Sequence, residues 1–134
     1  MGFHNSGGGG GGEKLVETVL WTNSDTTTQF VSGDVTLSDS IQNYDYLKFV
    51  FKSATTANAL KSVIYPVEEF TYTNVSNSWC RASSPMRSNS SGTNYVRGLI
   101  YKSDTSINIS NATAFNATGN SNTLAIPYQI IGLN

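Results

Sequence analysis

The strongest constraint on the fold is a strict alternation of apolar and charged residues near the middle of the chain. Successive side chains of an extended backbone point in opposite directions. Leu47, Phe49 and Phe51 therefore share one face, while Lys48 and Lys52 lie on the other. This period of two predicts a half-buried β-strand whose three apolar side chains face a core together.

Shorter apolar segments, rich in β-branched and aromatic residues, recur along the rest of the chain. They predict further strands at 15–22, 31–37, 59–67, 70–73, 95–102, 106–109 and 124–133. Clusters of Ser, Thr, Asn, Asp and Gly predict turns at 22–25, 32–34, 88–94 and 116–123. Residues 55–59 make one helical turn at most, and no longer helical stripe is present. The sequence therefore predicts an all-β fold, an antiparallel, jelly-roll-like β-sandwich.

Glycine and proline refine this arrangement. Gly98 marks a bulge or a close backbone approach within its strand. Pro66 cannot donate a ladder hydrogen bond, so it places that end of its strand at an edge. Pro127 favours an edge or near-edge position for the last strand for the same reason.

The last strand is apolar on both faces. Ile126, Tyr128 and Ile130 alternate onto one face, and Ala125, Pro127, Gln129 and Ile131 take the other. An open apolar edge invites association, and a closed symmetric homo-oligomer, most simply a trimer, would cover it. The alternative is burial within the monomer beneath the loop 70–79.

An unbroken glycine run at residues 7–12 sets the domain boundary. Glycine has the most backbone freedom to lose and no side chain to pack, so such a run behaves as a flexible linker. A packed polyproline-II-like bundle is the alternative, but it needs more than one run. We therefore expect a glycine-rich tether at 1–12 and a β-sandwich domain at 13–134.

Composition excludes several classes of partner. Charged residues make up 13% of the chain and the net charge is −1, which gives no electrostatic footprint for nucleic acid. The first residues lack the pattern of a signal peptide, and no apolar run is long enough to span a membrane. Cys80 is the only cysteine, so no disulfide forms within the chain. These features favour assembly in a reducing cytoplasm.

The missing side chains also argue against catalysis. The single histidine, His4, precedes the glycine run, so the folded domain has no base for Ser-His or Cys-His chemistry and no usual zinc site. We expect a non-enzymatic domain without cofactor or metal.

Two carboxylates are the remaining route to an enzyme, a glycosidase. Glu68 and Glu69 are adjacent and would face opposite sides of a strand, while Asp39 and Asp45 bracket a turn. Calcium at 23–25 or 43–45 is the other possibility for acidic residues. Asx turns, in which the Asn or Asp side chain bonds nearby backbone, are the more frequent use of both segments.

A binding surface is the remaining functional feature. Trp79 lies in a polar stretch together with Asn77 and Arg81, with Tyr72 before it and Arg87 after it. Aromatic faces flanked by amides and guanidinium groups suit sugars, because rings stack on rings and polar groups bond hydroxyls. The competing interpretation places Trp79 in the core.

Four pieces of the sequence together resemble the terminal β-domains of phage and prophage tail fibres and related virion appendages of Gram-positive gut bacteria. These are the glycine run, the opening segment 19–23 (VLWTN), the segment 44–52 (YDYLKFVFK) and the closing segment 125–133 (AIPYQIIGL). The resemblance covers residues 13–134 and rests on arrangement. It contains no binding motif, so no binding residues are carried over.

The resemblance implies a virion protein, commonly trimeric, assembled in the cytoplasm of a bacterial host. Such a domain presents its surface to host-cell glycans or receptors. The alternative is a structural decoration or assembly protein whose partners are other virion proteins.

Overall fold

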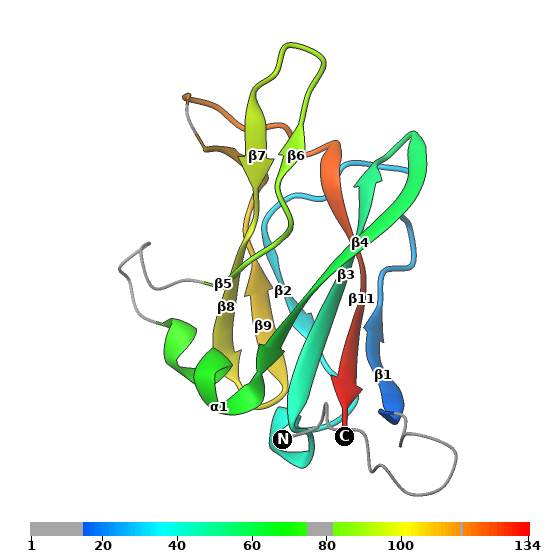
Figure 1. The fold of residues 1–134 in the computed structure, drawn as a ribbon, viewed down its shortest axis with the longest axis vertical. Helices are drawn as coiled ribbons and strands as arrows, with labels where there is room; N and C mark the ends of the chain where they lie inside the picture. Colours follow the sequence, from blue (N-terminus) through cyan, green and yellow to red (C-terminus); the bar gives the residue numbers. More distant parts are fainter. Residues whose placement is uncertain (1–14, 75–81, 116) are drawn as a thin grey trace, which may run out of the picture.

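The computed structural model describes residues 15–74, 82–115 and 117–134. Two four-stranded antiparallel sheets pack face to face, and a small three-stranded sheet extends the molecule at its upper end (Figure 1). The predicted all-β antiparallel sandwich is confirmed. The predicted tether at 1–12 lies outside the described residues.

The first sheet has the strand order β1-β11-β3-β4, with β1 (Glu17–Thr22), β11 (Leu124–Leu133), β3 (Tyr46–Ala54) and β4 (Ala57–Pro66). The second has the order β2-β9-β8-β5, with β2 (Gly33–Thr36), β9 (Ser106–Ile109), β8 (Gly98–Ser103) and β5 (Ala82–Ser83). The small sheet contains β10 (Thr113–Ala114), β7 (Asn94–Val96) and β6 (Arg87–Ser88). Short helical segments are η1 (Ile41–Asn43), α1 (Val67–Phe70) and η2 (Thr71–Asn74).

The alternation in β3 sets the orientation of the first sheet. Leu47, Phe49 and Phe51 are buried between the sheets, as predicted, together with Leu99, Ile107 and Ile109 of the second sheet. On the outer face, the Lys48 amine lies 3.2 Å from a Glu17 carboxylate oxygen. The Lys52 amine donates to the backbone oxygens of Thr26 and Thr55, at 3.2 and 3.0 Å, so its charge is solvated by backbone.

The prediction that β11 is an edge or near-edge strand is confirmed in its near-edge form, because β11 lies next to the edge strand β1. β11 lies between β1 and β3, and Pro127 sits where a bulge shifts the register with β3. A bulge already interrupts the ladder, so a residue without an amide hydrogen is tolerated there. Pro66, in contrast, ends the edge strand β4, as predicted.

Both faces of β11 are covered by the same chain. Its inner face joins the main core through Ile130. Its outer face forms a second cluster, in which Ile131, Leu133 and Val50 pack with Leu15, Tyr46 and Tyr128. The apolar character of this strand is therefore explained within the monomer, and it no longer requires a second copy of the chain.

Two local predictions are wrong, and the single helical turn allowed at 55–59 is not formed. Residues 70–73 are helical, because Val67 and Phe70 both reach the core at a spacing of one helical turn. Gly33 and Asp34, predicted in a turn, open β2. Residues 55–59 hold the tight turn of the β3–β4 hairpin and the start of β4.

The predicted strand 95–102 is divided at Arg97, one residue before Gly98. The Arg97 side chain is fully buried. Its guanidinium donates to five backbone oxygens, those of Phe30, Ser110, Asn122, Leu124 and Ala125, at 2.7 to 3.2 Å. It also lies over the Phe30 ring, 5.4 Å from the centroid. The interruption places this group where three connecting segments meet.

Candidate functional site

A groove lies between α1 and the segment that leads from η1 into β3, at the lower end of the molecule in Figure 1. The β3–β4 ladder brings the two sides together, because Tyr46 pairs with Pro66. The backbone amide of Val67 continues this pairing by donating to the backbone oxygen of Asp45 at 2.9 Å. The groove is therefore built on the end of the rigid sheet.

The groove has a volume of about 510 Å³ and an aromatic lining. Tyr44 and Tyr46 are half-buried, while Tyr72 on η2 is 73% exposed. Pro66 and Val67 add apolar surface between them. The groove thus offers several rings to a ligand, with one of them free to adjust.

Polar groups complete the lining. The carboxylates of Asp45 and Glu68 are exposed, and Gln42 and Thr71 also line the groove. Within the described part of the chain, no lysine or arginine lines it. The Gln42 amide nitrogen donates to Asp104 at 3.2 Å, so it is already engaged.

Tyr44 is held in place from two sides. Its hydroxyl donates to an Asp39 oxygen at 2.9 Å, and Asp39 also accepts from the Ser40 amide at 2.8 Å and the Asn43 side chain at 2.9 Å. The Tyr44 hydrogen bond lowers the pKa of Asp39 and raises the pKa of Tyr44. The ring packs against Gly132, where any side chain would overlap it.

Asn134 fixes the neighbouring backbone. Its side-chain oxygen accepts from the Asp45 amide at 3.1 Å, and its side-chain nitrogen donates to the Asn43 oxygen at 3.0 Å. The Asp45 amide also lies 3.0 Å from the Leu133 oxygen. The segment that carries two of the tyrosines is therefore positioned by the end of β11.

The structure places only part of the predicted binding surface. Tyr72 lines the groove, whereas Arg87 lies on β6 near the opposite end of the long axis (Figure 1). The two are not brought together. Asn77, Trp79 and Arg81 lie outside the described residues, as does Cys80.

Sequence reasoning missed the other groove residues as a binding set. The signal was present in the run Tyr44-Asp45-Tyr46, which alternates rings and a carboxylate. We interpreted that run only as the approach to a strand. Its meeting with Glu68 depends on the helical turn at Val67, which was predicted as strand.

Neither carboxylate pair predicted for a glycosidase forms as such. Of Glu68 and Glu69 only Glu68 lines the groove, and Asp39 is bonded to Tyr44. The pair that shares the groove is Asp45 and Glu68.

Metal ligation has no support in the described ranges. They hold no group of three or more His, Cys, Asp or Glu side chains suited to a metal ion. Asp25 accepts from the Thr27 amide at 2.8 Å, and its own amide donates to Asn23 at 3.1 Å, so the predicted Asx turns are present at 23–25.

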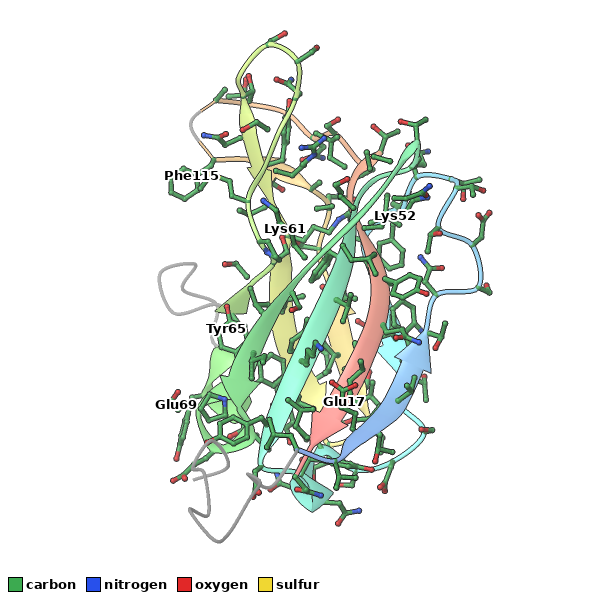
Figure 2. The ribbon with its side chains drawn as sticks, turned by 45° about the vertical axis from the view of Figure 1, so that its right-hand side comes forward. Glu17, Lys52, Lys61, Tyr65, Glu69 and Phe115 are labelled. Carbon is green, nitrogen blue, oxygen red and sulfur yellow. The ribbon has the colours of Figure 1, made fainter. Side chains whose placement is uncertain are left out.

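A second groove of about 470 Å³ lies between the small sheet and the second sheet. Met86 and Val96 line it, together with Phe115, which is 67% exposed. Figure 2 shows Phe115 at the upper end of the molecule and Glu69 at the lower end. This groove has one aromatic ring and no charged lining among the described residues, so it is the less complete site for a polar ligand.

Comparisons with known proteins give no family. No family model matches the chain, and no curated protein matches it. Among the residues described, no helix has both the length and the apolar character needed to cross a membrane.

Proposed function

We propose that this chain is a non-enzymatic β-sandwich domain that binds carbohydrate in the groove of Tyr44, Tyr46 and Tyr72. The observation that carries the proposal is the meeting of three tyrosines and two exposed carboxylates in one groove. Aromatic rings pack against the apolar faces of sugars, and carboxylates accept hydrogen bonds from hydroxyls. The volume of the groove falls within the range of roughly 300–1,000 Å³ that is typical of small-molecule binding sites.

The biological setting follows from the resemblance to tail-fibre terminal domains. On that basis the domain is part of a virion, its neighbours are other virion proteins, and its ligand is a glycan on the host surface. The groove lies beside the end of β11, and the β6–β7 hairpin lies at the other end of the long axis (Figure 1).

A structural role in the virion is the second candidate. The observation that favours it is an apolar strip on the outer face of the first sheet, where Val19, Leu60 and Ile64 are exposed. Val19 and Ile64 belong to one row across the sheet, with Ile131 and Lys48 between them. Such a strip suits another virion protein or another copy of this chain.

The test is a glycan array followed by calorimetric titration of the full chain with the best ligand. Tyr72→Ala is expected to weaken binding by about fivefold, since a stacked ring contributes on the order of 1 kcal/mol. Phe115→Ala is the matched control, because its ring is similarly exposed but lies at the second groove.

Three results would contradict the proposal. Absence of any glycan ligand removes the function. Loss of binding in Phe115→Ala but not in Tyr72→Ala moves the site to the second groove. Release of new reducing ends, lost in Glu68→Gln, makes the domain a glycosidase.

A further inference from the structure

We infer that the ligand of the tyrosine groove carries a positive charge, and that its chemical class is an amino sugar with free ammonium groups. This inference rests on the proposed function and specifies its substrate class. It follows from which hydrogen-bonding groups at the groove are already used and which remain.

The acceptors of the groove are open. Among the residues that the structure describes, none donates a hydrogen bond or forms an ion pair with the carboxylate of Asp45 or Glu68. Both side chains are exposed at the groove. A bound ligand can therefore approach both as a donor, and an ammonium group supplies several donors together with the complementary charge.

The donors near the groove are mostly committed elsewhere. The Tyr44 hydroxyl is bonded to Asp39 and the Gln42 amide to Asp104. The Lys48 amine, on the outer face of the same sheet, is paired with Glu17. A carboxylated, sulfated or phosphorylated sugar would thus meet two like charges, and none of the described residues that line the groove is a lysine or arginine to offset them.

The aromatic lining points the same way. A tyrosine ring has a negative face that attracts cations, with about 0.5–1 kcal/mol at exposed sites. Tyr44, Tyr46 and Tyr72 flank the two carboxylates in the same groove. A neutral sugar uses the rings and donates hydroxyl hydrogen bonds to the carboxylates, whereas an amino sugar adds the attraction between its ammonium groups and those carboxylates.

The experiment compares two oligosaccharides with the same backbone, a glucosamine hexamer and an N-acetylglucosamine hexamer. Binding to the full chain is measured at mildly acidic pH and low salt, where the free amines are protonated. We expect the glucosamine hexamer to bind about tenfold more tightly, because each exposed ion pair adds a factor of about two to five. Raising the salt to about 1 M, where the screening length is about 3 Å, should reduce this preference.

Charge-neutralising variants locate the effect. Asp45→Asn and Glu68→Gln should each lower affinity for the glucosamine hexamer by about two- to fivefold more than they lower affinity for the acetylated hexamer. Glu69→Gln is the matched control. It removes the same charge from the same short helix, but from a side chain outside the groove lining.

The outcomes separate the inference from the function. Equal affinity for the two hexamers, or preference for the acetylated one, overturns the inference and leaves carbohydrate binding intact. A Glu69→Gln effect as large as that of Glu68→Gln would show general charge attraction and overturn it as well. Absence of binding to either hexamer and to every glycan of the array removes the proposed function itself.

Discussion

Arg97 connects the backbone of three chain segments, at residue 30, at residue 110 and at residues 122–125. A buried guanidinium is costly unless its donors are satisfied, and here five backbone oxygens satisfy them without a carboxylate. Burial lowers the pKa of Arg97 to about 10, so the group remains protonated at neutral pH. One of its acceptors belongs to Ala125, which has a φ of 48°. The bond holds this uncommon backbone conformation in place.

Arg97→Lys should destabilise the domain by roughly 3 kcal/mol, because a single ammonium leaves several buried carbonyls without a donor. Urea unfolding followed by tyrosine and tryptophan fluorescence measures the change. Arg87→Lys is the control, since the Arg87 Nε has no hydrogen-bond partner among the described residues, and it should change stability by less than about 0.5 kcal/mol. Equal effects of both variants would contradict the role assigned to Arg97.

Tyr44 and Asp39 make stability depend on pH at both extremes. The folded pKa of Asp39 lies below its ordinary 3.8, so this group stabilises the fold above that pH and the contribution is lost on acidification. The folded pKa of Tyr44 lies above its ordinary 10.0, so its contribution is present below that pH and is lost as the pH rises further.

Tyr44→Phe should therefore weaken both dependences and raise the pKa of Asp39 toward 3.8, because the Tyr44 bond is the largest cause of its shift. Nuclear magnetic resonance titration of the Asp39 carboxyl carbon measures this directly. The hydrogen bonds from Ser40 and Asn43 remain, so part of the shift should persist. An unchanged Asp39 pKa would show that the Tyr44 hydroxyl is not its partner in solution.

At the scale of elements, the sequence predicted the features that depend on neighbouring residues of one segment, and it missed those that depend on a partner strand. The alternation in β3 gave its faces correctly, since a slip of one residue would expose three apolar side chains. Pro127 correctly favoured a near-edge position for β11, but the bulge at Pro127 was not predictable, because a bulge depends on the partner strand. The helical turn at Val67 was missed although Val67 and Phe70 have helical spacing, since short apolar runs are ambiguous. The groove depends on that turn, so its members could not be assembled from sequence.

Gly132 shows how closely β11 and the Tyr44 segment approach each other. Gly132→Ala should destabilise the domain by about 1–3 kcal/mol, because the added methyl overlaps the Tyr44 ring. Glycan affinity should fall in the same variant, since Tyr44 must move. Thermal unfolding and calorimetry test the two effects. Gly33→Ala is the control, with only ordinary contact for an added methyl, and it should affect neither strongly.

At the scale of the whole molecule, we expect any self-association to use the outer face of the first sheet. The trimer stays a prediction, although β11 pairs with β1 and β3 and so leaves no open edge of its own for a second copy to cover. β4 is an edge strand of this sheet, and two of its apolar side chains, Leu60 and Ile64, are exposed. An exposed apolar edge is a site at which chains pair.

Light scattering at micromolar concentration is expected to give the mass of a trimer for the native chain and a monomer for Ile64→Lys. Val31→Lys replaces another exposed apolar residue, which lies outside the sheet, and should keep the trimer. A native monomer with no concentration dependence would remove oligomerisation. Dissociation in both variants would place the contact elsewhere.

The bonds between Val16 and Asn134 have a practical consequence for handling the protein. The amide of each residue donates to the oxygen of the other, at 2.8 and 3.1 Å, and Asn134 also bonds Asn43 and Asp45 at the groove. A tag, dye or sensor surface attached at Asn134 therefore lies beside the groove and obstructs access of a ligand to it. The turn at residues 89–93, at the far end of the β6–β7 hairpin (Figure 1), is the better point of immobilisation. There an anchored molecule presents its tyrosines to the solution.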